Sequence, residues 1–316
     1  MTAPDDTASE ATTPGSASSP DPLSNAWILL TLAPLLWGGN AVAGKIAAAE
    51  WLPFTFTSLR WGCATLVLLP LAWRPLQRDW PLVKQNLVLL FLLGGVGMCL
   101  FNLSMYLALN YTSAINVSIE QAAIPVLIMV ANFLFLSQQV RAWQVFGLAV
   151  SIVGVFVTVT QGDPLSFFAS GLNRGDGLML LASLFYAAYS FGLRWRPAIH
   201  WLSFMLVISV SAFIVTLPFA GWELTQQSQA MPSMRGFLVL LYVAIFPTIF
   251  SQIAWARGVE LIGANRAGLF INLVPIFGSM LAVLILGEQF RWYHALGLLM
   301  VIGGIVVAER AASRSV

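Results

Sequence analysis

The sequence has few charged residues. Asp, Glu, Lys and Arg make up 9% of its 316 residues, whereas 59% are hydrophobic. A typical soluble domain carries roughly 25% charged residues. A folded chain of this composition cannot cover its surface with water-facing groups, so lipid must be the solvent for most of it. The formal net charge of +2 is too small to indicate a nucleic-acid partner.

Cysteine and histidine are also scarce. Cys63 and Cys99 both lie in apolar runs and provide no disulfide framework and no metal-binding pattern. The two histidines, His200 and His294, lie at the edges of apolar runs without a carboxylate at motif spacing. Gly39–Lys45 has the glycines and lysine of a phosphate-binding loop, but no Ser or Thr follows and no strand precedes it. We therefore expect no metal and no cofactor.

What the sequence has instead is long apolar runs. A bilayer core needs about 20 apolar residues per helix. Ten runs meet this requirement, and we expect a membrane-spanning helix over each of them: 26–47, 54–73, 86–108, 113–136, 142–160, 175–195, 201–220, 234–256, 264–286 and 293–310. Many begin or end at a tryptophan, as expected for residues at the membrane interface. The sequence therefore predicts an all-α polytopic membrane protein with ten transmembrane helices.

The segments outside these runs indicate orientation. Residues 1–24 are rich in Ser, Thr, Ala, Pro and Asp, and we expect a disordered tail rather than a signal peptide; residues 311–316 form a short C-terminal tail. With both termini in the cytoplasm, ten Lys or Arg residues lie on the inner side and four on the outer side, and Arg60 lies within a span. The excess of positive charge on the inner side predicts cytoplasmic N- and C-termini.

The chain contains an internal repeat at an offset of 150 residues. The informative matches are Pro125 with Pro275, Gln139 with Gln289, Arg141 with Arg291, and Gly147 with Gly297. Each half, 26–160 and 175–310, holds five predicted spans. Because five is an odd number, the second half must enter the membrane from the opposite side. This 5+5 inverted-topology repeat is typical of secondary transporters, in which the substrate site lies near the midplane at the repeat interface.

Several segments resemble the drug/metabolite transporter superfamily, and specifically its EamA-type ten-helix transporters. They are WGGNAVAGK from Trp37, YTSAINVSIEQAAIPV from Tyr111, GANRAGLFINLVPIFG from Gly263 and LGEQF from Leu286. The resemblance covers about residues 26–310. It implies export of amino acids or related metabolites across a bacterial inner membrane. The chain departs from the commoner pattern at Gln138, where the second half has Glu288, and at Glu120, where many relatives are apolar.

Glu120 is the most unusual residue within a predicted span. It follows Asn116 by one helical turn, precedes Gln121, and lies shortly before Pro125. Polar groups in a bilayer are costly and usually face a cavity or a partner. One interpretation is a contact for a substrate amine or a proton-coupling carboxylate. The other is a structural ion pair with Lys45 or Arg60. Pro125 should also leave the backbone carbonyl of Gln121 without its helical hydrogen bond.

The third and eighth predicted spans carry an equivalent pair of amides, Asn102 and Gln252, near Tyr106 and Trp255. Amides beside aromatic rings suit a pocket for a zwitterion with an apolar part, although polar residues also bond one helix to another. Weaker candidates for substrate contact are Trp37, Asn40, Tyr186 and Asn272. We expect the pocket between the fourth and ninth spans, with Pro125 and Pro275 as the points where these helices bend.

The predicted function is secondary active transport by alternating access around a midplane cavity, and the resemblance implies export. A membrane-embedded enzyme or a receptor or scaffold is the alternative. The enzyme would need clustered His, Asp or Lys at a membrane surface, and the receptor would need larger soluble portions. We expect a small-molecule substrate and the lipid bilayer as partners, no nucleic acid, and a monomer or homodimer. Localisation should be a bacterial inner membrane.

Overall fold

The computed structural model describes residues 25–136, 142–163, 165, 172–263, 267 and 269–313, with the side chains of 309 and 311–313 left out. The described residues form helices and turns and no strand. The N-terminal tail over 1–24 lies outside the described residues, as do Gln138, Gln139 and Arg141.

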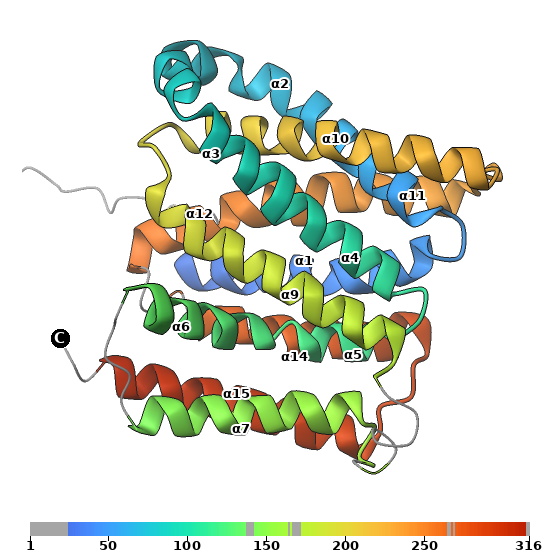
Figure 1. Ribbon diagram of the computed structural model, residues 1–316, viewed down its shortest axis with the longest axis vertical. Helices are drawn as coiled ribbons and strands as arrows, with labels where there is room; N and C mark the ends of the chain where they lie inside the picture. The colour runs from blue at the N-terminus through green and yellow to red at the C-terminus, as the bar shows by residue number, and fades with distance from the viewer. Residues whose placement is uncertain are drawn as a thin grey trace, which may run out of the picture.

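The helices follow one another as a series of hairpins (Figure 1). Those of the first half are α1 (Ala26–Ala47), α2 (Pro53–Gln85), α3 (Leu87–Phe91), η2 (Leu92–Cys99), α4 (Leu100–Ala108), α5 (Ala114–Glu120), α6 (Ala123–Leu136) and α7 (Ala142–Val159). Those of the second half are α9 (Arg174–Gly192), η3 (Leu193–Trp195), α10 (Trp201–Gln226), α11 (Met234–Ile245), η4 (Phe246–Phe250), α12 (Ser251–Ile262), η5 (Leu269–Asn272), α14 (Leu273–Leu281), η6 (Ala282–Leu286) and α15 (Trp292–Ser313).

Several of these segments join into longer continuous helices. Among the described residues, eight such helices are long and apolar enough to cross a membrane, and two further apolar helices, Phe270–Leu286 and Trp292–Ala308, are shorter. One expected boundary is wrong. The link predicted after residue 73 is helical, because α2 continues to Gln85 through Pro70, Pro75 and Pro81. Each proline removes one backbone hydrogen bond but does not end a helix whose neighbouring turns are packed. Leu68 and Ala72 of α2 are buried against Leu206 of α10.

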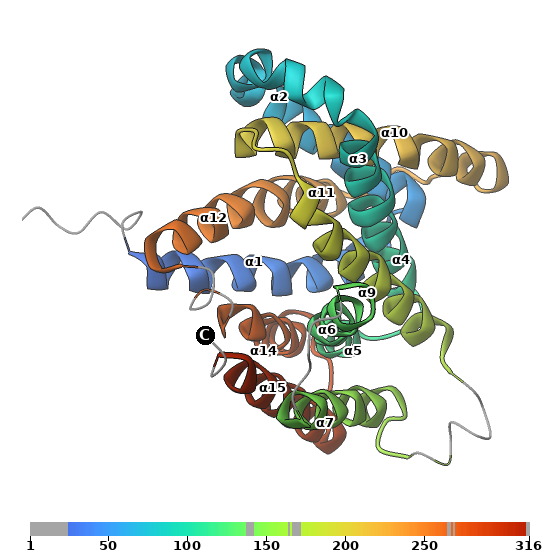
Figure 2. The same cartoon turned by 60° about the vertical axis from the view of Figure 1, so that its left-hand side comes forward.

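The helices α7 and α15 form a closely packed pair at one edge of the bundle (Figures 1 and 2). Gly154 faces the backbone of Gly297, where an added Cβ would lie 2.8 Å from the carbonyl oxygen, and Gly147 meets Gly304 in the same way. Between these contacts the hydroxyl of Ser151 donates to the carbonyl of Val301 at 3.2 Å. Small residues therefore let the two backbones touch, as expected for helices packed within a membrane.

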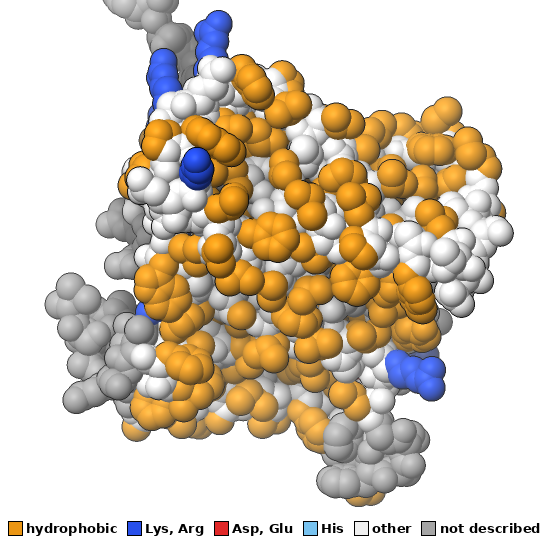
Figure 3. Space-filling view, turned by 45° about the horizontal axis from the view of Figure 1, so that its top comes forward, with side chains coloured by type: hydrophobic (Ala, Val, Ile, Leu, Met, Phe, Trp, Pro, Cys, Tyr) orange, Lys and Arg blue, Asp and Glu red, His pale blue; other side chains and the backbone are white. Residues whose placement is uncertain are grey.

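The outer surface of the bundle is apolar. Large hydrophobic side chains such as Leu66, Val88, Trp143 and Leu299 are 66–75% exposed. Figure 3 shows one face covered mostly by hydrophobic side chains, with the visible Lys and Arg side chains near its edges. Such a surface is unfavourable in water and suited to lipid.

Three carboxylates bind the backbone at helix starts. Glu223 accepts from the amides of Phe54 and Thr55 at 3.2 and 2.7 Å. Glu50 accepts from the amide of Ser233 at 2.7 Å. Glu288 accepts from the amides of Ala114 and Ile115 at 2.8 and 3.0 Å. The first amides of a helix lack partners within the helix, so these contacts connect the loop ends on one side of the bundle.

Candidate functional site

Two helices are interrupted at equivalent places. In the segment predicted as the fourth span, α5 ends at Glu120 and α6 begins at Ala123, with a turn between them. In the segment predicted as the ninth span, the 3-10 segment η5 ends at Asn272 and α14 begins at Leu273. Pro125 and Pro275 follow each interruption by two residues. We expected the carbonyl of Gln121 to lack its helical hydrogen bond, which would come from residue 125. This carbonyl is nevertheless not free, because it accepts from the amide of Ile124 at 3.0 Å. The proline therefore shifts the hydrogen bond by one residue and interrupts the helix.

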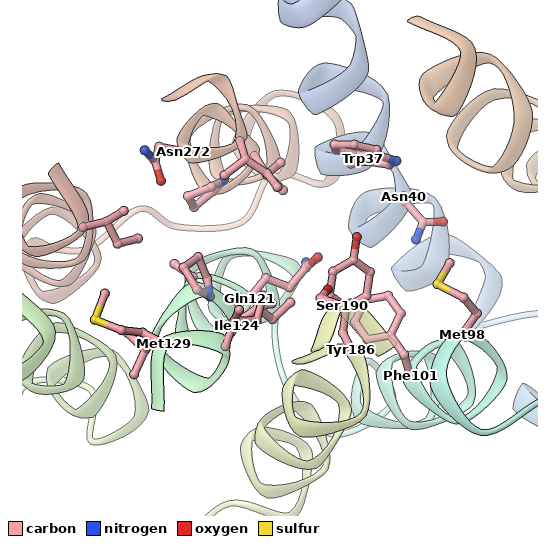
Figure 4. A pocket seen from close by; sticks show the side chains of 18 of the residues that line it. Trp37, Asn40, Met98, Phe101, Gln121, Ile124, Met129, Tyr186, Ser190 and Asn272 are labelled. Atoms are coloured by element: carbon pink, nitrogen blue, oxygen red, sulfur yellow. The ribbon is translucent and has the colours of Figure 1, made fainter. Parts of the chain in front are cut away.

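A cavity of about 550 Å³ lies where these interruptions meet α1, α9 and the central parts of the third and eighth spans. Figure 4 shows Tyr186 and Gln121 pointing into it, Trp37 and Asn40 on one side, and Asn272 on another. Aromatic, Met and Ile side chains form much of the wall. The cavity continues past Phe133 of α6 to Ala308 of α15, near the ends of these two helices.

The structure brings together most of the residues proposed from the sequence. Those that line the cavity are Trp37, Asn40, Asn102, Gln121, Tyr186, Gln252 and Asn272, together with Pro125, Pro275 and Arg60. Tyr106 and Trp255 are not in the wall but contact residues that are. Tyr106 donates to Oδ1 of Asn40 at 2.8 Å, and the Trp255 ring lies 5.4 Å from that of Trp37. Asn272 is 7% exposed and its Oδ1 has no partner among the residues that the structure describes, which leaves an acceptor available to a ligand.

Arg60 is held in the wall by neutral groups. Its Nη1 donates to Oδ1 of Asn102 and, at 2.6 Å, to the hydroxyl of Tyr106. Its Nε and Nη2 donate to the hydroxyl of Thr248 at 3.1 and 2.9 Å. No carboxylate is among the partners that the described residues provide. The ion pair that we considered between Arg60 and Glu120 is therefore absent.

Glu120 lies behind the cavity wall. It is fully buried, and neither carboxylate oxygen has a hydrogen-bond partner when the group is ionised. The titratable group that interacts with it is Asp176 of α9, which is 1% exposed and within hydrogen-bonding reach. Two carboxylates are both acceptors, so they bond only if one of them carries a proton. The alternative ion pair with Lys45 is not formed either, because Nζ of Lys45 donates to the carbonyls of Leu109 and Thr112, both at 2.7 Å.

A second cavity, of about 340 Å³, lies near the end of α1 and the starts of α5 and α15. Lys45, Asn116, Glu288 and His294 are among the residues that line it. A chain of polar contacts connects it to the buried acids. The hydroxyl of Thr112 lies 2.5 Å from Asp176 and 3.2 Å from Nδ2 of Asn116. Oδ1 of Asn116 lies 3.2 Å from Nε2 of His294. Asn116 therefore belongs to this second cavity and not to the central one.

Three contributors were missed from the sequence. Thr248 is one hydroxyl among many in apolar runs and carries no signal of its own. Asp176 follows Arg174 and an N-cap at Asn173, and so resembles an ordinary acid in the first turn of a helix. His294 was set aside because it lies at the edge of a run. A signal for Asp176 was available, because it is a second acid within an apolar run, after Glu120. It lies in the predicted sixth span, which the predicted repeat makes equivalent to the first span.

A bundle of apolar helices around a partly polar cavity defines a polytopic membrane protein. The model of the EamA-like transporter family matches the chain twice, over residues 25–160 and 173–309. The chain therefore belongs to the EamA-like transporter family. This confirms the resemblance found in the sequence and identifies the chain as a member of a family of transporters.

Individual relatives agree with this assignment. The uncharacterized transporter YetK of Bacillus subtilis is 26% identical over 89% of this chain and 86% of its own length. An uncharacterized transporter of Archaeoglobus fulgidus is also 26% identical, over 89% of this chain and 96% of its own. The uncharacterized inner membrane transporter YicL of Salmonella typhimurium is 23% identical, with 90% and 94% covered. A solved crystal structure with 17% identity has the same fold, with a TM-score of 0.62 over 92% of this chain and 98% of that chain.

Proposed function

We propose that the protein is a secondary active transporter that exports small metabolites, such as amino acids or related compounds, by alternating access around the central cavity. The observation that supports this most is the cavity itself, because two interrupted helices from opposite halves of the chain meet at it. Interrupted helices at the interface of two repeats are the usual construction of a transporter's substrate site.

Ten transmembrane helices in a 5+5 inverted repeat, with residues 26–160 and 175–310 as the halves, account for several features at once. Adding 150 to the start of α6 gives the start of α14. The π-helical segments η2 (Leu92–Cys99) and η4 (Phe246–Phe250) also overlap after this shift. The contact of Gly147 with Gly304 becomes that of Gly297 with Gly154, so the α7–α15 pair maps onto itself. A two-fold rotation between the halves explains these correspondences.

Access to the cavity is proposed to be from the cytoplasm in this conformation. The cavity extends toward the C-terminal end of α6 and past Ala308, on the side to which the positive charges assign the cytoplasm. On the other side, every residue of α5 is buried and Glu288 binds the start of that helix. In the outward-facing state α5 and its contacts would separate while the cytoplasmic side closes.

Glu120 and Asp176 are proposed to hold the coupling proton, which makes transport a proton exchange. Ionising both would place two negative charges in contact where no described cation binds them. Among the other charged or titratable groups on the elements packed around α5, Lys45 of α1, Tyr293 and His294 of α15 and Glu288 just before it line the second cavity, whereas Tyr186 of α9 lines the central one. Thr112 and Asn116 connect this cavity to the pair, which gives a proton a route from the outer side.

The remaining expectations have the same basis. The proposed location is a bacterial inner membrane with both termini in the cytoplasm, and the partners are lipid and a small-molecule substrate. No enzymatic activity is proposed, and a monomer contains both halves of the site, although a homodimer is compatible with it.

Counterflow in proteoliposomes tests the transport proposal. Vesicles loaded with an unlabelled compound should accumulate the labelled form of that compound transiently, for at least one member of a panel of amino acids, nucleosides and cationic drugs. Protein with Gly38→Leu is the matched control, because a side chain there would collide with the backbone of Gly278 and separate α1 from α14. Equal signals from wild-type, control and protein-free vesicles across the panel would reject the proposal.

A further inference from the structure

Arg60 is a buried cation for which the described residues provide no counterion. It is 3% exposed, and it is the one residue with a formal charge among the described residues that line the central cavity. Moving a charge out of water costs several kcal/mol unless an opposite charge or a full set of hydrogen bonds compensates. The groups around Arg60 are an amide and two hydroxyls, all neutral. The charge is thus solvated but not neutralised.

The hydrogen bonds leave part of the guanidinium unused. A guanidinium has five N–H donors. The bonds to Asn102 and Tyr106 use both hydrogens of Nη1. The hydroxyl oxygen of Thr248 accepts from the single hydrogen of Nε and from one hydrogen of Nη2. One Nη2 hydrogen has no acceptor among the described residues. The fork is fixed in direction by partners on two elements, α4 and η4, and its charge-assisted bonds favour an oxyanion.

The surroundings indicate what such an anion is attached to. Most of the wall is apolar or aromatic, including Trp37, Phe101 and Ile124, and the amides Gln121, Gln252 and Asn272 are uncharged. One cation balances one negative charge. A phosphate dianion would leave excess charge buried in this wall, whereas a monoanionic carboxylate on an apolar or aromatic body would not.

We infer that Arg60 binds the carboxylate of the transported substrate, so the central cavity takes monocarboxylates, including the carboxylate end of amino acids, and rejects organic cations. The inference rests on the proposed transport function, whose substrate it narrows. Arg60 is then a binding residue rather than a structural or gating one. Asn102, Tyr106 and Thr248 are positioning residues that hold the guanidinium toward the cavity.

The probes are 3-phenylpropionate, its neutral analogue 3-phenylpropanamide, the cation 3-phenylpropylamine, and benzyl phosphate. Binding to the purified full chain in nanodiscs is measured by the concentration dependence of the shift in unfolding temperature. We expect 3-phenylpropionate to bind at least tenfold more tightly than the amide and the amine. Tighter binding of the amine or the amide would overturn the assignment, and tighter binding of benzyl phosphate would reassign the site to phosphate esters.

Two substitutions locate the effect. Arg60→Gln removes the charge and should abolish the preference for the carboxylate; a charged hydrogen bond corresponds to roughly ten- to a hundredfold in affinity. Asn102→Asp leaves Arg60 in place and supplies a carboxylate of nearly identical shape, which should displace the probe's carboxylate and abolish binding even if Arg60→Gln does not fold. Arg257→Gln, in an exposed ion pair with Glu260, is the control. An Asn102→Asp protein that binds 3-phenylpropionate like wild type would refute the inference.

Binding and transport separate the two proposals. Counterflow of neutral or cationic compounds without carboxylate binding would reject the anion site and keep the transport function. Carboxylate binding that depends on Arg60, with no counterflow of any carboxylate, would reject the transport function and keep the site.

Discussion

At the scale of single residues, the bundle contains two kinds of buried ionisable group, a cation and a pair of acids. Arg60 reaches the cavity, whereas Glu120 and Asp176 lie behind its wall, close to the second cavity. The cation is therefore placed to meet substrate and the acids are placed to meet a proton. Because the cation and the acids are separated, a substitution can affect substrate binding without affecting the proton, or the reverse.

Glu120→Gln keeps the shape of the side chain and removes its ability to release a proton. We expect the folded yield to remain near that of wild type, and counterflow to continue, because exchange of substrate requires no net proton movement. Uptake driven by an imposed pH gradient should fall at least tenfold, because a proton-holding carboxylate would be lost. The measurement is gradient-driven uptake and counterflow in the same proteoliposomes.

Two controls accompany this experiment. Asp176→Asn should behave like Glu120→Gln if the pair shares a proton, and the exposed Glu260→Gln should behave like wild type. If Glu120→Gln responds to the pH gradient as wild type does from pH 5.5 to 8, the proton role is contradicted.

At the scale of elements, the apolar runs predicted the helices well, because length and hydropathy alone decide whether a segment crosses a membrane. The sequence also indicated the interruptions beside Pro125 and Pro275, since proline removes a helical hydrogen bond. It did not indicate which polar residues meet. Asp176 and Glu120 are far apart in the chain, and their contact depends on how α9 packs against α5. Helix rotation within a bundle is decided by packing, which one sequence without relatives does not reveal.

The contact between Glu288 and the start of α5 is expected to keep one side of the bundle closed. Glu288→Ala removes both hydrogen bonds to the amides of Ala114 and Ile115. Loss of a helix cap costs about 1 kcal/mol. We expect a lower unfolding temperature and faster hydrogen exchange at residues 114–120, measured by mass spectrometry. Glu223→Ala is the matched control, because it removes a similar cap at α2 and should leave exchange in α5 unchanged. Unchanged exchange in both variants would show that α5 needs no cap.

Glu50 makes the corresponding contact for the segment before α11, and it should respond to pH. Hydrogen bonds from Ser233 lower the pKa of Glu50 below its usual value. A carboxylate with a lowered folded pKa stabilises the fold above the unfolded pKa, and this contribution is lost as the pH falls through the folded value. Glu50→Gln should therefore lower the unfolding temperature at pH 7 and have less effect as the pH drops below about 4. If the unfolding temperatures of wild type and variant differ by the same amount at pH 7 and below about pH 4, this role is contradicted.

At the scale of the whole molecule, the two halves share several backbone features and differ in the side chains that line the cavity. Helix breaks, π-helical segments and the α7–α15 contact correspond after a shift of 150 residues. By contrast, Gln121 corresponds to Ile271, and Asn272 to Ala122, within the same cavity wall. Similar shapes let the halves exchange conformations, whereas the unequal side chains suit a substrate that is not symmetric.

The proposed cytoplasmic opening can be tested at Gln121, which lies at the helix break and lines the cavity. In a background with Cys63→Ala and Cys99→Ala, Gln121→Cys should react with a membrane-impermeant maleimide in inside-out vesicles and react at least tenfold more slowly in right-side-out vesicles. The reason is that the buried helix α5 separates this position from the second cavity. Tyr111→Cys, half-exposed at the second cavity, is the control and should show the opposite preference.

C-terminal fusions to alkaline phosphatase and to a fluorescent protein fix the orientation independently; the fluorescent fusion alone should be active. If the fusions place the C-terminus in the cytoplasm and Gln121→Cys nevertheless reacts faster from outside, the cavity opens outward and the proposed conformation is wrong.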